Sequence, residues 1–369
     1  MIAVDRSGPA LRTLHVIASM DARHGGDVRA TIDLCTTLML LGEHCEIATL
    51  DAPLSAGRGP HTARGSHDAA AQSGSAPGVT VHRFAPSPPV RLGNSIELAR
   101  WLAHHARDYD LVEIHGVFRA TTLIAATCAR RAGVPYIVHP HGSLDPFDLR
   151  KHHTAKRLLA PLFNRLLLRP ASAVVFTSPT EMRNADTFGA LTHRACMPPP
   201  IVDDEIAGDR SRFRDRVGAA DSAFVLLFMS RIDYKKGLIR TLRAVTQLRG
   251  SGLDLELAVA GTGDAAYTAK VLDAVRVLHI AEHVHFLGFV EGQAKADAFA
   301  GSDAFILASD NENFGVVVVE ALRRRIPVII SDRVAIAADL EAAGAAVVVA
   351  ADEASTAAGI AAVAGDPER

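Results

Sequence analysis

Two glutamates, Glu312 and Glu320, stand eight residues apart directly after an apolar run over residues 304–308. The run is typical of a buried parallel strand. A helix opening at about Asn313 would direct its first free N–H groups over the end of that strand, where open α/β sheets bind ligands and where anions are favoured. Two carboxylates placed there can each hold a pair of vicinal hydroxyls.

A glycine lies between the two glutamates, and it allows the backbone to approach a ligand closely. Phe314 and Gly315 precede four β-branched residues, Val316–Val319, which would suit a buried strand as well as a helix. The stretch therefore favours a sugar carried on a phosphate, and a solvated helix start with incidental glutamates remains the alternative.

A second charged pair follows another apolar run, residues 224–229. Arg231 and Lys236 flank the turn after it and could converge on a diphosphate, arginine through its planar fork and lysine as a mobile point charge. Gly261 ends the next apolar run, residues 255–260, and indicates another close approach. An arginine and a lysine at such a turn are usually ordinary surface charges. Whether Arg231 and Lys236 bind a diphosphate therefore depends on the rest of the pattern, including the two glutamates.

The N-terminal half offers a glycine pair and histidines at predicted strand ends. Gly25 and Gly26 lie between an apolar run and a helical pattern, which is a phosphate-binding unit in outline, although G-x-G-x-x-G is absent. His115 ends the run over residues 110–114, and the run over residues 135–138 leads into a His-Pro-His-Gly stretch. Catalytic residues are often found at the carboxyl ends of strands in such sheets, but a purely structural role suits His115 equally well.

The elements that must position these residues alternate between strand and helix in both halves. A proline run at residues 198–200, followed by acidic residues 203–205, is typical of a linker, and the βα pattern restarts after it. Residues 51–80 predict a long mobile loop. We therefore predict an α/β protein with domains over residues 1–199 and 200–369.

Residues 150–169 form a basic amphipathic segment. It predicts either a surface helix with its apolar face in the core, or a segment lying on an anionic membrane.

Composition excludes several functional classes. The 369 residues are 49% apolar and 5% aromatic with a net charge of −2, so no overall field favours nucleic acid. The four cysteines form no C-x-x-C pair and are interpreted as buried thiols, with a metal site unexpected. Without a signal-peptide pattern or an apolar run of about 18 residues, the chain is predicted to be cytoplasmic.

Taken together, the segments resemble the retaining glycosyltransferases of the GT-B fold, family 4, over nearly the whole chain. The Gly-Gly turn, the His-Gly strand end, the Arg231 to Gly237 stretch and the Glu312 to Glu320 stretch occur in the order and spacing of that family. The stretch from His139 to Pro146 is most similar to members that build bacterial surface polysaccharides and exopolysaccharides. The resemblance implies two Rossmann-like domains facing across a cleft.

The resemblance assigns roles to the charged residues. Arg231 and Lys236 would neutralise the donor diphosphate in place of a metal, so no cofactor is expected beyond a nucleotide-diphosphate sugar. Glu312 would hold hydroxyls of the donor sugar and Glu320 those of the ribose. His115 would lie beside the donor sugar and support charge at the reacting centre.

The remaining predicted roles belong to backbone groups. The amides that follow Phe314 and Gly315, including that of Val316, would add to the stabilisation of the leaving nucleotide. Backbone groups at Phe289 and Val290 would bind the base of the donor nucleotide. Gly261 would permit close approach, and Gly25 and Gly26 would face the phosphates. The resemblance further implies front-face attack and a glycan or polyprenyl-diphosphate-linked acceptor, with the protein cytoplasmic or peripheral on the inner membrane face.

Two departures from the family pattern stand out. The domain junction reads Pro-Pro-Pro where Pro-Asn-Gly is common, and the family's final crossover helix is not expected within the chain. A catalytically silent homologue that acts as a binding or assembly subunit, and a sugar-nucleotide epimerase, are the alternative functions. A periplasmic binding protein suits the two-domain layout but not the missing signal pattern.

Overall fold

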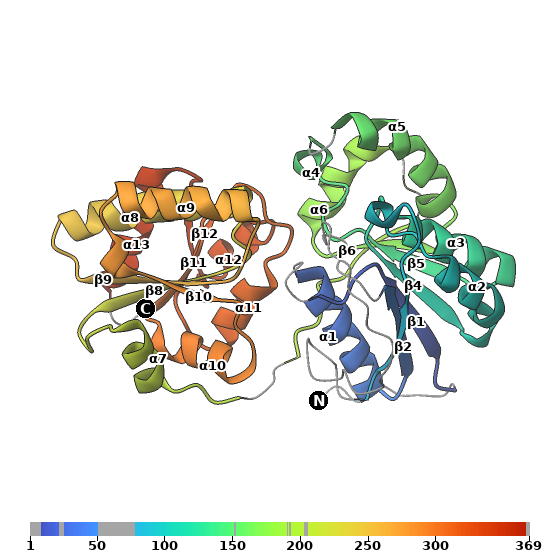
Figure 1. The fold of residues 1–369 in the computed structure, drawn as a ribbon, viewed down its shortest axis with the longest axis horizontal. Helices are drawn as coiled ribbons and strands as arrows, with labels where there is room; N and C mark the ends of the chain where they lie inside the picture. Colours follow the sequence, from blue (N-terminus) through green and yellow to red (C-terminus); the bar gives the residue numbers. More distant parts are fainter. Residues whose placement is uncertain are drawn as a thin grey trace. The chain divides into compact units, whose positions relative to one another are not determined.

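The computed structural model describes residues 9–21, 26–50, 78–150, 153–189, 191, 193–202 and 206–366. The chain divides into two compact units, Met1–Val202 and Asp203–Arg369. Each unit carries one parallel β-sheet with helices on both faces (Figure 1). The predicted α/β class is thereby confirmed, and each unit is Rossmann-like.

The first unit is built on a seven-stranded sheet with the order β3-β2-β1-β4-β5-β6-β7. Its strands are β1 (Arg12–Ile17), β2 (His44–Leu50), β3 (Thr80–Phe84), β4 (Leu111–His115), β5 (Tyr136–His139), β6 (Ala173–Phe176) and β7 (Arg194–Cys196). The order runs outward in both directions from β1 and β4. Because right-handed crossovers to opposite sides place helices on opposite faces, this order produces three layers.

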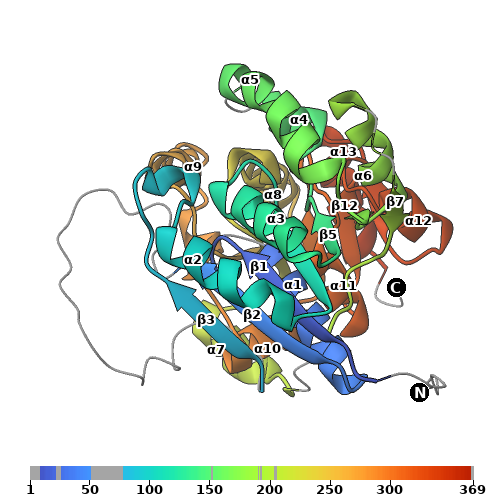
Figure 2. The same ribbon diagram turned by 90° about the vertical axis from the view of Figure 1, so that its right-hand side faces the viewer.

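Helices cover both faces of the first sheet. The longer ones are α1 (Gly26–Leu40), α2 (Ile96–His105), α3 (Ala120–Ala132) and α5 (His153–Phe163), with the shorter α4 (Pro146–Arg150) and α6 (Pro179–Asn184). Figures 1 and 2 show α1 on one face and α2 with α3 on the other. Ser95 caps α2 by accepting from Leu98 N at 3.1 Å, which fixes where that helix begins.

The second unit has a six-stranded sheet with the order β10-β9-β8-β11-β12-β13. Its strands are β8 (Phe224–Met229), β9 (Leu255–Ala260), β10 (Val284–Gly288), β11 (Ala304–Leu307), β12 (Val328–Ser331) and β13 (Val347–Val349). The central strands read as nearly unbroken apolar runs because both of their faces are covered.

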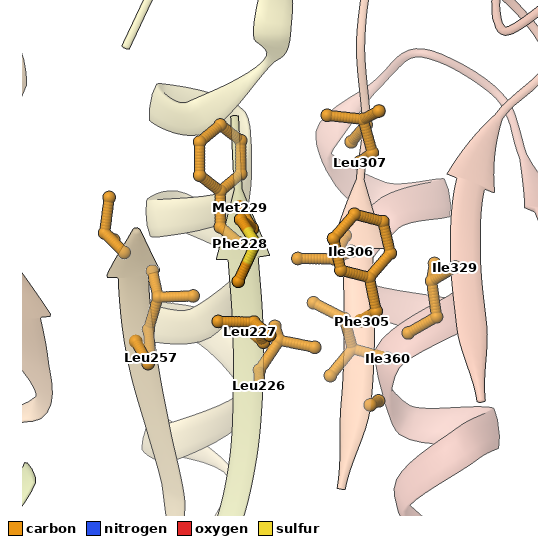
Figure 3. Close-up of a cluster of buried hydrophobic side chains, with 14 of the residues drawn as sticks. Leu226, Leu227, Phe228, Met229, Leu257, Phe305, Ile306, Leu307, Ile329 and Ile360 are labelled. Carbon is orange, nitrogen blue, oxygen red and sulfur yellow. The ribbon is translucent and has the colours of Figure 1, made fainter. Parts of the chain in front are cut away.

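The helices of the second unit are α7 (Arg210–Val217), α8 (Leu238–Gly250), α9 (Ala265–Val277), α10 (Gly292–Gly301), α11 (Val316–Arg323), α12 (Ala337–Ala342) and α13 (Glu353–Ala364). Figure 3 shows Leu226 of β8 pointing toward Phe305 of β11 and Ile360 of α13, and Phe228 belongs to the same buried cluster. These side chains are fully buried. The core therefore holds β8 and β11 side by side, and the predicted site residues follow these two strands.

Two strands were not predicted. β3 and β7 both lie at the edges of the first sheet and pair with one neighbour only. Their sequences are short and partly polar, so they lack the apolar run that marks a central strand. The predicted loop over residues 51–80 ends where β3 begins, and residues 51–77 lie outside the described residues.

Two predicted helices differ from the structure. α11 begins at Val316, three residues later than the start expected at about Asn313, and Val316–Val319 are helical rather than a strand. The basic segment begins at the last residue of α4 and contains α5 and a π-helical turn, η4 (Asn164–Leu168). Of its leucines, Leu167 and Leu168 are buried, whereas Leu158, Leu159, Leu162 and Leu166 are exposed. The core therefore buries only part of the apolar surface of the basic segment.

The cysteines only partly match the prediction of buried thiols. Cys35 and Cys45 are buried and Cys128 is half-buried, but Cys196 is exposed because it lies on the edge strand β7. Among the described residues, no helix is long and apolar enough to cross a membrane.

Candidate active site

Three glycines bring strand ends of the second unit into close contact. A Cβ on Gly237 would lie 1.9 Å from Ala308 O, one on Gly261 1.9 Å from Ser230 O, and one on Gly263 1.9 Å from Ile232 O. No side chain fits at such distances, so each position requires glycine. The turns after β8, β9 and β11 therefore pack backbone against backbone, and the side chains that follow them gather at one edge of the sheet.

Lys236 and Glu312 are brought together at this edge. Lys236 ends the short 3₁₀ turn η6 (Tyr234–Lys236), which Asp233 caps by accepting from Lys235 N at 3.1 Å. The Lys236 ammonium donates to Glu312 Oε2, and both side chains are largely buried, 7% and 15% exposed. The lysine predicted for the diphosphate and the glutamate predicted for the sugar are therefore ion-paired to each other.

The backbone of Glu312 is fixed by a loop that lies farther along the chain. Its N–H donates to Arg333 O at 3.2 Å and its carbonyl accepts from Ala335 N at 3.0 Å. This short parallel bridge, centred on Val334, keeps the chain extended past residue 312. It also explains why α11 begins later than its sequence predicts.

The start of α11 is a turn that needs glycine. Gly315 adopts a left-handed conformation, φ +76°, and no side chain caps the helix. The first amides of the helix are consequently open to a ligand, with the positive end of the helix dipole behind them. Phe314 packs against the core and anchors this turn.

Arg231 follows β8 and is half-buried. Within the part of the chain that the structure describes, it has neither a hydrogen bond nor an ion pair. A guanidinium in that condition keeps all of its donors available for an anion. Arg231 and Lys236 lie at the two ends of one loop, as predicted.

Glu320 lies in the second turn of α11 and is paired as well. Its Oε1 accepts from Lys295 Nζ of α10 at 2.6 Å, and the two side chains are 12% and 19% exposed. Lys295 was not among the predicted site residues.

Phe289 and Val290 follow β10, the edge strand next to β9. Phe289 is 42% exposed, whereas Val290 is buried at 9%. Gly261 N donates to Gly288 O at 2.7 Å, which ties this loop to the turn after β9. An exposed aromatic ring beside a fixed backbone could stack on a base.

In the first unit, His115 ends β4 and is 3% exposed. His15 on β1, His139 at the end of β5 and His141 surround it, with ring-centroid distances of 5.4, 4.8 and 5.3 Å. Glu113 accepts from His139 Nε2 at 2.7 Å. We did not predict His15, Glu113 or His141 as site residues. Gly26 begins α1, and Gly25 lies outside the described residues.

Burial keeps two of these imidazoles neutral. It lowers the pKa of His115 well below its usual value, and His139 and His141 lower it further. Burial, followed by the nearby His139, lowers the pKa of His141 to about 4. Within the described residues, His15, Glu113 and His115 form the one set with metal-binding side-chain types close together, and hydrogen bonds among histidines already use the ring nitrogens of His115.

Two Rossmann-like units, one of them with paired charges and an uncapped helix start at its strand ends, define the GT-B class. The family model "Glycosyl transferases group 1" matches residues 209–369, and "Glycosyl transferase 4-like domain" matches residues 7–200. The chain belongs to this family of group 1, or family 4, glycosyltransferases.

Individual relatives are distant. A D-inositol 3-phosphate glycosyltransferase of Stackebrandtia nassauensis is 30% identical over 58% of this chain and 52% of its own length. A GDP-mannose-dependent mannosyltransferase of Mycolicibacterium smegmatis is 28% identical over 60% of this chain and 59% of its own. The matches thus span between half and three fifths of these relatives.

Among solved structures, Anabaena HepE in complex with UDP-glucose superposes with a TM-score of 0.71 at 18% identity, covering 96% of this chain and 94% of the other. At that identity the likeness establishes the fold alone.

Proposed function

We propose that the protein is a retaining glycosyltransferase that moves a sugar from a nucleotide-diphosphate sugar to a glycan or a lipid-linked glycan. The observation that carries the proposal is the ion pair of Lys236 with Glu312 just before the uncapped start of α11, with Glu320 in the second turn of that helix. Arg231 lies in the same loop as Lys236. Two cations in the turn after β8, with one carboxylate after β11 and one in α11, suit a ligand that is anionic at its centre and rich in hydroxyls at both ends.

The departing nucleotide is where charge develops in such a transfer. As the bond between the anomeric carbon and the phosphate oxygen breaks, Arg231, Lys236 and the first amides of α11 stabilise the negative charge on the diphosphate. The two turns are held by backbone hydrogen bonds before reaction: Lys236 N donates to Asp233 O at 3.0 Å in η6, and Val318 N donates to Gly315 O at 2.8 Å at the start of α11. We expect no metal in this role.

Glu312 and Glu320 bind hydroxyls in this proposal rather than acting as acid and base. Glu312 takes hydroxyls of the donor sugar, and Lys236 exchanges part of its contact with Glu312 for the diphosphate. The acceptor hydroxyl forms its bond to the anomeric carbon on the face the nucleotide leaves, and its proton passes to a phosphate oxygen. His115 supports the charge at that carbon through its neighbours.

The nucleoside of the donor is uridine or guanosine in this proposal, so the base is uracil or guanine. The named relatives include a GDP-mannose-dependent enzyme, and the superposed HepE binds UDP-glucose. Backbone groups at Phe289 and Val290, with the exposed Phe289 ring, would hold either base. The choice of sugar lies with side chains that no motif specifies.

We further propose that the acceptor is a glycan on a polyprenyl diphosphate, used in polysaccharide synthesis, and that the protein touches an anionic membrane. Leu158, Leu162 and Leu166 lie four residues apart on the side of α5 and η4 that faces solvent, 81%, 44% and 36% exposed. Arg165 and Arg169 are exposed beside them. Apolar insertion with flanking cations is how an interfacial helix holds an anionic bilayer.

Vesicle sedimentation tests this contact. The double variant Leu158→Ser/Leu162→Ser should lose binding to phosphatidylcholine vesicles containing phosphatidylglycerol. Arg165→Gln/Arg169→Gln should weaken it by about fivefold per charge. Leu272→Ser/Val277→Ser on α9, where both side chains are at least as exposed as Leu162, should bind like the unaltered protein. Equal binding by all variants would refute the membrane contact.

A panel of nucleotide sugars tests the transferase itself. Thermal stabilisation reports donor binding whether or not chemistry follows, and nucleotide release with and without a membrane extract reports transfer. Selective stabilisation together with acceptor-dependent release is the expected result. Thermal stabilisation without nucleotide release would favour a catalytically silent homologue. If no nucleotide sugar of the panel stabilised the protein, the donor site would be refuted.

A further inference from the structure

The turn after β6 has the sequence of a capping box, in which a serine at the N-cap and a glutamate three residues later each satisfy a backbone N–H of the other. Ser178 fills the first role, since its Oγ accepts from Glu181 N at 3.1 Å and Pro179 follows as the first residue of α6. The Glu181 carboxylate does not fill the second role, because it accepts from residues outside α6. The glutamate of this motif therefore serves a contact beyond its own helix.

Three donors meet the Glu181 carboxylate. Its Oε1 accepts from Gly142 N at 2.6 Å, and its Oε2 accepts from both Thr177 N and Thr177 Oγ1 at 2.7 Å. Glu181 and Thr177 are buried, so these hydrogen bonds are sheltered from water, and the charge of the acceptor strengthens them. Because β5 and β6 pair in parallel, with Val138 opposite Val174, the loops after the two strands lie side by side. One carboxylate therefore joins the two loops.

The loop after β5, which Glu181 holds, contains two left-handed residues in succession. His141 has a φ of +49° and Gly142 a φ of +80°, and Ser143 N donates to Pro140 O at 3.1 Å across them. Positive φ at both central residues is the pattern of a type I′ turn, which glycine adopts without a steric cost and histidine does not. A histidine keeps such a conformation only where its surroundings impose it.

The hydrogen bond from Gly142 to Glu181 stabilises this turn directly. A β-turn uses the amide of its fourth residue and leaves the amide of its third residue without a partner inside the turn. The third residue here is Gly142, which is buried, and a buried N–H without an acceptor is costly. Because Glu181 Oε1 supplies that acceptor, the carboxylate favours the left-handed conformation over the alternatives.

The conformation of the turn determines where the His141 ring lies. His141 Nε2 is 3.0 Å from His115 Nδ1, and the two rings stack with their centroids 5.3 Å apart. His115 is the last residue of β4 and is buried, so the sheet fixes its position. His141 is half-buried and depends on the turn for its position. A turn that relaxed to right-handed backbone would move the His141 ring and break this hydrogen bond.

We propose that Glu181 is a positioning residue of the transferase: its carboxylate holds the strained turn after β5 and, through that turn, keeps the His141 ring hydrogen-bonded to His115. The inference rests on the proposed function, in which His115 supports charge at the reacting carbon. Glu181 acts on the reaction only through Gly142 and the two histidines.

The position requires a carboxylate because three donors share two oxygen atoms. Glutamine has nearly the same shape, but it offers one oxygen and an NH₂ group that donates. In either orientation of the glutamine amide, one backbone N–H, that of Gly142 or that of Thr177, faces another donor. Glu181→Gln therefore changes the hydrogen bonds and leaves the packing volume almost unaltered.

Ser178→Ala is the matched control, because it alters the other half of the same motif. It removes the cap of α6 and leaves all three donors of the Glu181 carboxylate in place. We expect both variants to lower the melting temperature, since a lost cap and a mispaired buried carboxamide each destabilise the fold. Only Glu181→Gln should change the contact between the histidines.

Nitrogen NMR reports on that contact without any need for turnover. In the full chain labelled with ¹⁵N-histidine, the variants His115→Phe and His141→Phe assign the ring signals of the two residues. We expect Glu181→Gln to move the ring signals of both histidines and Ser178→Ala to leave them unchanged. Unchanged ring signals in Glu181→Gln, or equal changes in the two variants, would overturn the positioning role.

Nucleotide release connects the turn to the reaction. At a temperature where both variants are folded, Glu181→Gln should lower kcat by about 10²-fold, with the KM for the donor changed by less than about twofold. Ser178→Ala should retain the kcat of the unaltered protein. An equal loss of kcat in the two variants would show that Glu181 matters only for stability. If the unaltered protein released nucleotide from no sugar donor, the transferase would be refuted, and the histidine signals would still decide whether Glu181 holds the turn.

Discussion

Lys295 Nζ of α10 lies 2.6 Å from Glu320 Oε1 of α11, so the carboxylate proposed to hold ribose hydroxyls is already paired. Both side chains are less than one fifth exposed. A pair this sheltered is screened less by solvent than an open surface pair. A ribose that reaches Glu320 must share or displace this contact.

A double-mutant cycle between these two residues should therefore depend on the donor. We expect Lys295→Met and Glu320→Gln to show a coupling of about 1 kcal/mol in the free energy of unfolding without ligand. The coupling should become smaller once a nucleotide sugar is bound, because ribose hydroxyls then donate hydrogen bonds to the Glu320 carboxylate and weaken its pairing with Lys295. Urea unfolding with and without saturating donor measures it, and an identical coupling in both conditions would remove Glu320 from the ribose.

Loss of Lys236 should harm chemistry more than folding. Lys236→Met removes a cation that faces the developing diphosphate charge, and we expect kcat to fall by about 10²-fold. The partner Glu312 is left without its cation, so Lys236→Met/Glu312→Gln should recover stability but not turnover.

The matched control is Lys270→Met, because Lys270 is an exposed lysine of α9 in the same unit. Steady-state nucleotide release and thermal melts of the three variants separate the two effects. Normal turnover in Lys236→Met would show that this lysine does not face the diphosphate.

Close backbone approach should make Gly263 intolerant of any side chain. A Cβ at residue 263 would lie 1.9 Å from Ile232 O, and the φ of this glycine is not in the left-handed region, so the cost is purely steric. We expect Gly263→Ala to lower the free energy of unfolding by about 3 kcal/mol. Gly250→Ala, where a Cβ would meet nothing within 4 Å, should change it by less than about 1 kcal/mol. Similar unfolding curves would mean that the turns after β8 and β9 can separate at little cost.

The sequence predicts the central strands well because their burial on both faces leaves a simple pattern. β8 and β9 match their predicted bounds, as continuous apolar runs that helices cover on both sides. The edge strands β3 and β7 escape prediction because they mix polar and apolar residues in segments of five and three residues. An edge strand is defined by the neighbour it pairs with, and that neighbour is distant in sequence.

The candidate site residues are predictions from residue type, and the side chains that surround them were missed because they depend on strand register. His15 lies opposite Glu113 in the pairing of β1 with β4, and His115 lies opposite His139 in the pairing of β4 with β5. A prediction of strand order and register would have brought these side chains together. Lys295 has no such signal, since only the packing of α10 places it beside Glu320.

Acid should destabilise the protein through its buried histidines. The pKa of His141 is lowered to about 4 and that of His115 well below its usual value, with burial as the largest cause in both. In the unfolded chain both titrate near pH 6.5. Below that pH the unfolded state therefore binds protons at these histidines that the folded state does not bind. The contribution of the two neutral histidines to the free energy of unfolding is complete above about pH 6.5 and is lost as the pH falls toward 4.

The histidine responsible can be identified by substitution. Over the range from pH 7 to pH 4, His141→Gln should remove on the order of 2 kcal/mol of the pH dependence of unfolding. The control His104→Gln alters an exposed histidine of α2, and should leave the pH dependence as it is. Urea unfolding at half-unit pH steps measures the three proteins. If His141→Gln and the unaltered chain lose stability in parallel as the pH falls, protonation of His141 is not the cause of the acid destabilisation. Carboxylates such as Glu113, whose pKa is lowered in the folded protein, would then be the groups to examine.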